Sequence, residues 1–444
     1  MTNTSLKRLL ILFVFSLTQC FATTYFVRPG GSGNGTSWAN AWGNVSSIGW
    51  SSLSPGDTVC VAGGSYSGTL STGKSGTSSS PITVKRAAAS DSTCGSGTSG
   101  WSASYDSHIA MSGTIGLAND YVTIDGATLN GITITLTNPN PGGSDGSGIW
   151  VGGPTSGVVL RNIEVAGPCP SGQTCAQNAD NRSVNLNYWT GSSYALQNNM
   201  TLQYMNLHGA CTILWSAHSN NLVIEHSRFA DTSDTTPGNP YCHPNVIATQ
   251  DTSLVFRYNE VTTWEVEGIM SCPSGACTFS AAIYGNVWHD PFPGYHRILE
   301  PQYNSNGPWL FYNNTIVNDD FECASNGANG GSFAPGSQGR NNLFIGDGFN
   351  KCGLPDDDYD AASGSTGETH GQNSVPTNIF ANYSAKNIAG YHLSSGTTSG
   401  ANLGTPYNID YDGNGRTTWD RGAFEYNGSA SGPSAPTGLM ATVQ

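Results

Sequence analysis

A short pattern of apolar residues, apolar-x-apolar-x-x-x-x-apolar, returns many times along this chain. Its clearest copies start 36, 42, 22, 32, 27 and 28 residues apart and span 122–129, 158–165, 200–207, 222–229, 254–261, 281–288 and 309–316. The alternation predicts a strand, and the last apolar residue re-enters the core after a turn. One copy cannot bury its apolar face alone, whereas stacked copies can. The sequence therefore predicts an all-β solenoid, a right-handed parallel β-helix with loops held by disulfides.

Asparagine recurs at one position of this pattern. Asn259, Asn286 and Asn314 share that position in their copies, and Asn342 continues the series. Asparagine side chains both donate and accept hydrogen bonds, so a stack of them can bond along the solenoid. The alternative, that asparagine only favours turns, predicts less regular placement. We expect an internal ladder with a structural role.

The two ends of the chain differ in composition from the repeats. Lys7 and Arg8 precede the apolar run 9–17, and Ala22 ends a short polar stretch, as in a secretory signal peptide. No later stretch approaches the ~20 apolar residues of a membrane span. We expect a secreted, extracellular protein, with the periplasm as the other destination. The expected domains are a signal peptide at 1–22, the β-helix at 23–426, a linker at 427–433, and at 434–444 a segment that resembles the start of a truncated fibronectin type III module.

Cysteine usage agrees with export. Removal of the signal peptide takes Cys20 and leaves ten of the eleven cysteines, an even number. Metal-ligand spacings such as Cys-x-x-Cys are absent, which favours disulfides over zinc. Pairing of cysteines near one another in sequence predicts Cys60–Cys94, Cys169–Cys175, Cys211–Cys242, Cys272–Cys277 and Cys323–Cys352.

The charge balance restricts the partners. Without Lys7 and Arg8 the mature chain has 14 basic and 30 acidic residues, a net charge of −16. Such a surface repels nucleic acid and anionic membranes. A local basic patch can still bind a polyuronate. We expect a monomer that acts on an extracellular polysaccharide, with no nucleic-acid or membrane partner.

Both ends of the predicted β-helix resemble a known superfamily. The segment 24–42 and the segment 53–66, Leu-Ser-Pro-Gly-Asp-Thr-Val-Cys-Val-Ala-Gly-Gly-Ser-Tyr, are similar to the first coils of secreted bacterial β-helix proteins of the pectate-lyase-like superfamily. The segment 410–426 is similar to their closing coil. The resemblance implies this fold for 24–426. It leaves the reaction open, because the superfamily includes lyases, hydrolases, epimerases and non-enzymes.

A second strand follows each copy of the pattern, and its polar residues form columns when the apolar residues are aligned. One column contains Thr212, Asn245, Glu267 and Arg297. Two residues earlier, a parallel column contains Ala210, His243, Glu265 and Tyr295. Neighbouring coils lie ~4.8 Å apart. The patch 243–300 is therefore the densest polar cluster that the sequence predicts.

The order Asn, then Glu-x-Glu, then Arg resembles the calcium site of the chondroitinase-B and alginate-lyase family. The resemblance implies Ca²⁺ held by Asn245, Glu265 and Glu267, with Arg297 neutralising the substrate carboxylate. That family has a Lys base in the following loop, which here contains no Lys. His243, His296 or Tyr295 would then move the proton. This first hypothesis is a lyase that cleaves a uronate-containing glycan by β-elimination.

Other hypotheses use the same patch. A glycoside hydrolase would pair Glu265 or Glu267 with Asp290 or Glu300. A non-catalytic carbohydrate-binding protein needs only the solenoid surface, and a purely structural network would pair Glu267 with Arg297. The side chains expected to contact substrate are Trp264, Asp290, Tyr295 and Glu300.

Overall fold

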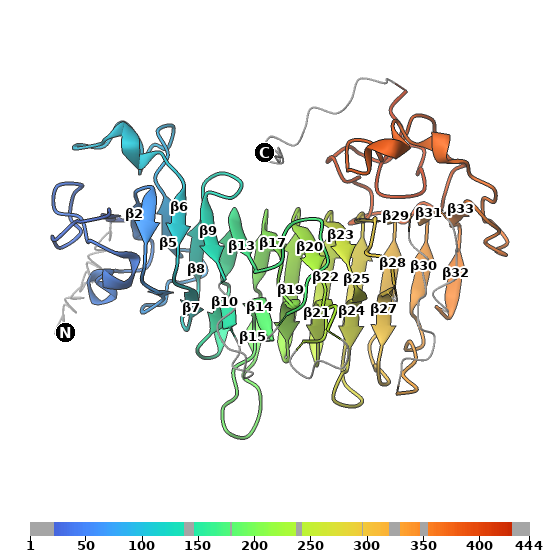
Figure 1. The fold of residues 1–444 in the computed structure, drawn as a ribbon, viewed down its shortest axis with the longest axis horizontal. Coiled ribbons are helices and arrows are strands. Elements are labelled where there is room, and N and C mark those ends of the chain that lie inside the picture. Colours follow the sequence, from blue (N-terminus) through green and yellow to red (C-terminus); the bar gives the residue numbers. More distant parts are fainter. Residues whose placement is uncertain are drawn as a thin grey trace, which may run out of the picture.

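The computed structural model describes residues 22–136, 146–177, 180–236, 242–294, 296–318, 329–346 and 354–428. Its coils stack along one axis, from the N-terminal coils at one end to the C-terminal coils at the other (Figure 1). Three parallel sheets run along the stack, which confirms the predicted parallel β-helix.

Sheet A is formed by the first strand of each repeat. Its order is β1 (Thr24–Val27), β2 (Thr58–Val61), β5 (Ile82–Arg86), β8 (Val122–Asp125), β12 (Val159–Arg161), β16 (Thr201–Gln203), β19 (Ser219–Glu225), β22 (Thr252–Arg257), β25 (Ser280–Tyr284), β28 (Trp309–Tyr312), β30 (Gln338–Arg340) and β32 (Asp356–Asp358), with β11 (Thr155–Ser156) and β15 (Gln197–Asn198) beside it.

Sheets B and C complete each coil. Sheet B contains β3 (Gly64–Tyr66), β6 (Ile109–Met111), β9 (Ile132–Thr135), β13 (Ile163–Ala166), β17 (Asn206–His208), β20 (Arg228–Thr232), β23 (Glu260–Trp264), β26 (Val287–His289), β29 (Thr315–Val317), β31 (Leu343–Ile345) and β33 (Ala361–Ala362). Sheet C contains β4 (Leu70–Ser71), β7 (Ile115–Leu117), β10 (Gly146–Val151), β14 (Asn181–Asn185), β18 (Thr212–Ser216), β21 (Asn245–Thr249), β24 (Val266–Ser271) and β27 (His296–Pro301).

Helical structure in the described residues is limited to short 3₁₀ turns. They are η1 (Val45–Ser47), η2 (Trp50–Ser52), η3 (Ala103–Tyr105), η4 (Thr377–Ile379) and η5 (Tyr383–Ala385). Within the described ranges no helix has the length and apolar character needed to cross a membrane.

The turn from sheet A to sheet B explains the repeated pattern. In the copy at 254–261, β22 ends at Arg257, and Tyr258 turns the chain with a left-handed φ of 55°. Asn259 then points into the core before β23 begins. Other copies place a left-handed residue at the same position, including Gly285, which tolerates it at no steric cost.

The predicted asparagine ladder is confirmed. Asn286 donates from Nδ2 to Asn314 Oδ1 at 2.9 Å and from its backbone N–H to the same oxygen at 3.1 Å. Asn259 donates the same paired bonds to Asn286 Oδ1, and Asn314 donates them to Asn342 Oδ1. The ladder ends at Asp360, whose Oδ1 accepts both bonds from Asn342. All of these side chains are buried, so the bonds satisfy polar groups that have no access to water.

Disulfides and a C-terminal segment complete the fold. The predicted pairs Cys60–Cys94, Cys169–Cys175, Cys211–Cys242 and Cys272–Cys277 are all present. The predicted pair Cys323–Cys352 lies outside the described residues, as do the proposed module at 434–444 and nearly all of the signal peptide. After β33 the chain folds back over the last coils (Figure 1), and its apolar side chains pack on the outer face of sheet B.

Candidate functional site

The predicted polar column forms on sheet C. Asn245 pairs with Thr212 on one side and with Glu267 on the other, and Glu267 pairs with Arg297. The column points outward. A Cβ added at the neighbouring Gly268 would lie 2.9 Å from the buried Trp288 ring, so position 268 faces the core and Glu267 faces the opposite side. The apolar pattern had therefore set the register correctly.

One further member of the column was not predicted. Arg182 of β14 pairs with Thr212 and extends the column by one coil. Its guanidinium lies 4.1 Å from the centre of the Trp215 ring, and it forms an ion pair with Asp180. β14 lies within a long insertion that has no copy of the apolar pattern. The signal that could have found it is the match of residues 182–185 to residues 212–215, in which Val184 lies opposite Leu214.

Four side chains of this site form a continuous chain of polar contacts. Arg297 Nη1 lies 2.9 Å from Glu300 Oε1. The Glu300 carboxyl hydrogen-bonds to Glu267, and Glu267 Oε2 lies 3.3 Å from His243 Nδ1. Burial raises the pKa of Glu267 well above its usual range, the charge of Glu300 raises it further, and Arg297 offsets this only in part. Glu267 therefore holds a proton more strongly than an exposed glutamate does.

This chain of contacts runs from the protein interior to solvent. Glu267 is 4% exposed and Glu300 is 1% exposed, whereas the His243 side chain is 59% exposed. The two buried carboxyl groups thus lie beside an imidazole that substrate can reach, and its Nδ1 also lies 3.1 Å from Asn245 Nδ2. Such an arrangement suits general acid–base chemistry.

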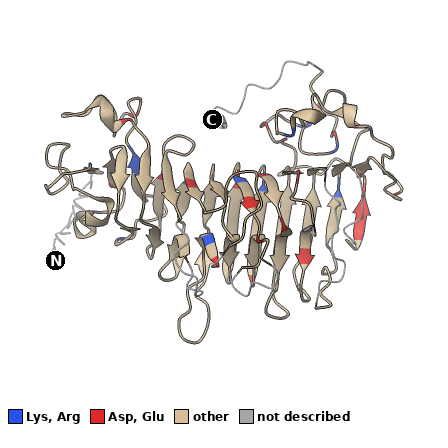
Figure 2. Ribbon diagram, in the orientation of Figure 1, with Lys and Arg blue, Asp and Glu red and all other residues tan. Residues whose placement is uncertain are grey.

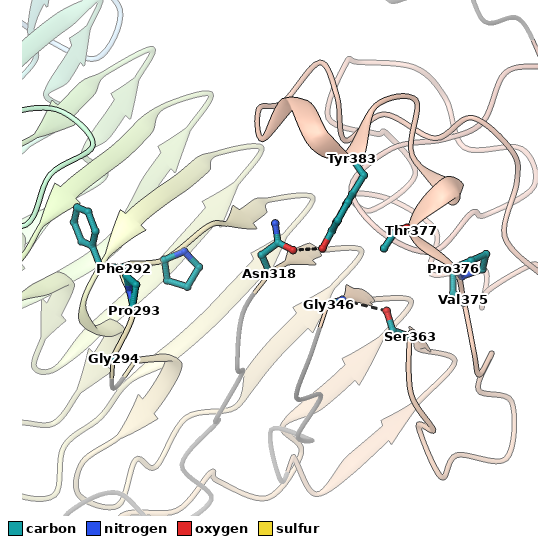
Figure 3. A pocket seen from close by; sticks show the side chains of 11 residues that line it. Phe292, Pro293, Gly294, Asn318, Gly346, Ser363, Val375, Pro376, Thr377 and Tyr383 are labelled. Atoms are coloured by element: carbon teal, nitrogen blue, oxygen red, sulfur yellow. Dashed lines mark hydrogen bonds between the residues drawn. The ribbon is translucent and has the colours of Figure 1, made fainter.

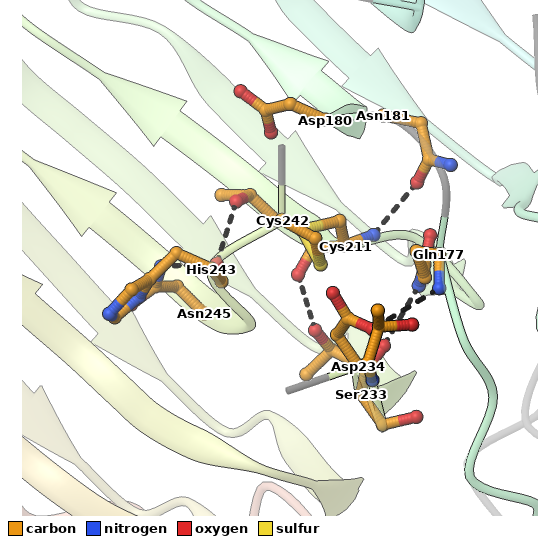
Figure 4. The surroundings of a disulfide bond; sticks show 12 residues. Gln177, Asp180, Asn181, Cys211, Ser233, Asp234, Cys242, His243 and Asn245 are labelled. Atoms are coloured by element: carbon orange, nitrogen blue, oxygen red, sulfur yellow. Dashed lines mark hydrogen bonds between the residues drawn. A yellow bond between two sulfur atoms is a disulfide. The ribbon is translucent and has the colours of Figure 1, made fainter. Parts of the chain in front are cut away.

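The backbone around His243 is held on several sides (Figure 4). The His243 carbonyl accepts hydrogen bonds from Thr212 Oγ1 at 3.2 Å and from Asn245 Nδ2 at 2.7 Å. The preceding residue, Cys242, forms a disulfide with Cys211, which directly precedes Thr212. The disulfide therefore fixes the segment that carries the imidazole to the first strand of the column.

Removal of this disulfide is expected to impair the site more than the fold. The double substitution Cys211→Ser with Cys242→Ser should lower kcat by about 10- to 100-fold, because a misplacement of about 1 Å can cost that much. The matched control removes Cys60–Cys94, which lies in the first coils. Initial rates and melting temperatures of both variants should be compared. Equal rates at equal folded fractions would contradict a positioning role.

Glu265 does not join the paired residues Asn245 and Glu267, so the expected set of three calcium ligands is incomplete. Glu265 lies at the corner between β23 and β24 and accepts a hydrogen bond from the backbone N–H of Asp234 at 3.2 Å. Glu267 instead faces an imidazole and another carboxyl group. Calcium takes six to eight oxygen ligands. The residues present do not fit that ion, and no step of the reaction is derived through it.

Two of the expected substrate contacts are corrected by the structure. Trp264 is fully buried, with its ring 5.8 Å from that of Trp288, so it belongs to the core and is not a sugar platform. Asp290 lies on the sheet B side of the coil, where it contacts His289, Asn318 and Tyr391. Although burial opposes ionisation, these hydrogen bonds lower the pKa of Asp290 to about 2.

Asn318 connects Asp290 to a cavity of about 530 Å³ (Figure 3). The cavity is lined by Phe292 and Pro293 on one side and by Val375 and Tyr383 of the C-terminal segment on the other. Tyr383 donates a hydrogen bond to Asn318 Oδ1. This cavity belongs to the junction between sheet B and the C-terminal segment and contains none of the polar column.

Three predicted site residues remain: Tyr295, His296 and Glu300. Tyr295 lies outside the described residues. The backbone of His296 pairs with Val266 at the start of β27, next to Arg297. Glu300 lies on the outer face beside Arg297, but it is too buried for the direct substrate contact that was expected.

One acidic cluster in the described residues has the spacing of a cation site, and it lies elsewhere. Oxygens of Asp357, Asp360 and Glu368 lie within 4.8 Å of one another. Burial raises the pKa of Asp360, and the charges of Asp357 and Glu368 raise it further. The cluster is at the last coil, next to the acidic strand β32 that is visible in Figure 2, and Asp360 also ends the asparagine ladder.

Comparisons with known proteins agree with the fold. No protein-family model and no curated protein matches the chain. The solved structure of the pectate lyase Pel9A is 13% identical, with a TM-score of 0.55 over 91% of this chain and 96% of that one. The complex of XylC with xylose is 9% identical, with a TM-score of 0.46 over 73% and 69%, and a rhamnogalacturonan lyase is 12% identical, with a TM-score of 0.40 over 81% and 91%. The chain has the parallel β-helix fold of Pel9A.

Proposed function

We propose that this protein is a secreted polysaccharide lyase that cleaves a uronate-containing glycan on the outer face of sheet C. One observation carries the proposal: an exposed imidazole, His243, is backed by two buried carboxyl groups in contact with each other, Glu267 and Glu300. The fold shared with the pectate lyase Pel9A supports the same class of reaction.

In the proposed reaction His243 moves the proton. It removes the proton from the carbon next to the uronate carboxylate, the electron pair forms the C=C bond, and the glycosidic C–O bond breaks. The leaving oxygen receives a proton from the imidazolium. Glu267, 3.3 Å from Nδ1, stabilises the charged ring and connects it to Glu300.

Arg297 is the group proposed to attract the substrate carboxylate. A guanidinium has five N–H donors, so it can hold Glu300 and a second carboxylate together. Its charge makes the neighbouring proton of the uronate more acidic. The high overall negative charge of the chain makes such a local cationic group the main attraction for an anionic substrate.

Burial argues against the hydrolase hypothesis at this site. A glycoside hydrolase needs two carboxyl groups that flank the scissile bond. Glu267 and Glu300 are in contact with each other and almost inaccessible, and Asp290 lies on another sheet. The His243 imidazole reaches substrate, whereas the carboxyl groups of Glu267 and Glu300 do not.

The test is an assay with polygalacturonate, alginate and glucuronoxylan, with neutral glycans as controls. We expect ultraviolet absorbance from unsaturated uronate ends on at least one uronate polymer. Because the calcium ligands do not assemble, the rate should be the same in EDTA. New reducing ends without absorbance would contradict the lyase and support a hydrolase.

The shifted pKa of Glu267 predicts a distinct effect of pH on stability. Because burial raises this pKa above the ordinary 4.5, the folded state keeps a proton that the unfolded state loses. The stabilising contribution is complete below pH 4.5 and is lost as pH rises towards the folded-state pKa. The free energy of unfolding of the wild type should therefore fall relative to Glu267→Gln above pH 4.5, by on the order of 1 kcal/mol per pH unit.

Glu425→Gln is the matched control. Although burial opposes its ionisation, backbone N–H groups of Thr418, Thr417 and Asp420 lower the pKa of Glu425. Its contribution is complete above pH 4.5 and lost only at lower pH, so the difference from wild type should be constant above 4.5. Urea titrations at several pH values measure both differences. A pH-independent difference for Glu267→Gln would show that Glu267 is ionised in the folded protein.

A further inference from the structure

Three large aromatic side chains remain in solvent on one hairpin. Tyr188, Trp189 and Tyr194 are 38%, 56% and 42% exposed, and they are the exposed large hydrophobic residues of the described chain. The hairpin joins β14 to β15 and projects from the edge of the solenoid (Figure 1). Because the other large aromatic residues of the described chain are at least partly buried, an exposed cluster of this kind marks a binding surface.

The hairpin holds its rings in place. Trp189 and Tyr194 form an antiparallel bridge, and their rings meet edge to face at 5.1 Å. Backbone hydrogen bonds from Ala195 N–H to the Tyr188 carbonyl at 2.8 Å and across the tip close the turn. The aromatic faces are therefore presented in a fixed arrangement, which lowers the entropy cost of binding.

The hairpin begins at the rim of a cavity of about 510 Å³. Asn187, which precedes Tyr188, lines this cavity together with Asn185, Trp150, Ser147 and further neutral residues. Among the described residues that line this cavity, none carries a charge. An aromatic ring surrounded by hydroxyl and amide groups is suited to an uncharged sugar, which offers both C–H faces and hydroxyl groups.

The cavity and the polar column lie on the same sheet. Trp150 of β10 pairs with Asn185, Asn185 with Trp215, and Trp215 with Ala248 of β21, the strand that begins at Asn245. Three coil steps of ~4.8 Å thus separate Trp150 from the strand next to His243, about 14 Å. A polysaccharide that lies along the solenoid axis covers this distance with a few sugar units.

We propose that the hairpin 187–196 and the cavity beside it bind uncharged sugars of the same polysaccharide chain that is cleaved at His243. The proposal rests on the proposed function and narrows the substrate class. The charged group Arg297 meets uronate units, whereas the neutral cavity meets neutral units. The substrate is thus a mixed polymer that contains both.

The test separates binding from cleavage. Binding is measured with the His243→Gln variant by affinity electrophoresis in gels that contain glucuronoxylan, a neutral backbone with uronate branches, or polygalacturonate. Adding Trp189→Ala and Tyr194→Ala should weaken binding to glucuronoxylan about tenfold, as expected for the loss of anchoring aromatic residues. The effect on polygalacturonate should be smaller. Ser192→Ala, in the same hairpin, is the matched control and should leave binding unchanged.

Kinetics with the otherwise wild-type enzyme give the second readout. The aromatic substitutions should raise KM for the polymer more than KM for the shortest oligosaccharide that is cleaved. Unchanged binding and KM would overturn the inference while leaving the lyase proposal intact. Normal glycan binding without product from any polymer would overturn the lyase proposal alone. Retention of the protein on anionic vesicles that is lost with the aromatic residues would assign the hairpin to a membrane and overturn the inference.

Discussion

Replacement of His243 by glutamine is expected to lower kcat by about 10²- to 10⁴-fold on the uronate polymer that the protein cleaves. Glutamine keeps hydrogen-bonding capacity but cannot take up a proton. The buried pair Glu267 and Glu300 is then left without a neighbouring group that can exchange a proton with substrate. The melting temperature should change little, because the imidazole is mostly exposed. Initial rates at saturating substrate and thermal melts measure the two effects.

His208→Gln is the matched control for this result. His208 on sheet B also pairs with a glutamate, with its Nε2 3.0 Å from Glu164 Oε1, but it lies away from the polar column. Its substitution should leave kcat within about twofold of wild type, since surface substitutions away from a site usually have small effects. If both variants lose activity equally, or if neither does, the assignment of His243 is wrong.

Asn314→Ala, in the middle of the ladder, is expected to be strongly destabilising. It removes the oxygen that accepts both bonds from Asn286 and the amide that donates to Asn342 and to the Ile283 carbonyl. Each buried polar group left without a partner costs about 1–3 kcal/mol, so the total loss should be about 3–5 kcal/mol. The midpoint of urea unfolding should fall accordingly.

The exposed Asn220 on sheet A provides the comparison. Its side-chain contacts lie at 3.3 and 3.4 Å near solvent, so Asn220→Ala should cost less than about 0.5 kcal/mol. Similar unfolding midpoints for the two variants would show that the ladder contributes no net stability. A large difference identifies the internal bonds as a main source of cohesion between coils.

The sequence predicted those features that depend on regular repetition. Alternating apolar residues set which positions face the core, and a shift by one residue would expose the whole apolar set, so the register was well determined. This is why Asn245, Glu267 and Arg297 align as expected, and why the asparagine ladder was correctly placed.

Two residues that lie elsewhere than expected, Glu265 and Asp290, are at corners next to strands. The Glu-x-Glu spacing puts Glu265 and Glu267 on one face only if a single strand continues through both. Here Thr263 and Val266 have left-handed φ values of 49° and 66°, so the chain turns and Glu265 faces Asp234 instead. The same kind of corner, at Asp290 with φ 47°, directs that side chain towards Tyr391, a contact 101 residues away that no local pattern encodes.

The acidic strand β32 has a consequence for how the solenoid ends. It is the last strand of sheet A, and all three of its residues, Asp356 to Asp358, are aspartates. A strand edge offers unpaired backbone groups to any further strand, but the side chains of a strand added here would lie beside carboxylates on both faces of the sheet. The stack that can in principle grow by one coil after another therefore has a fixed length, and filament formation through this edge is disfavoured.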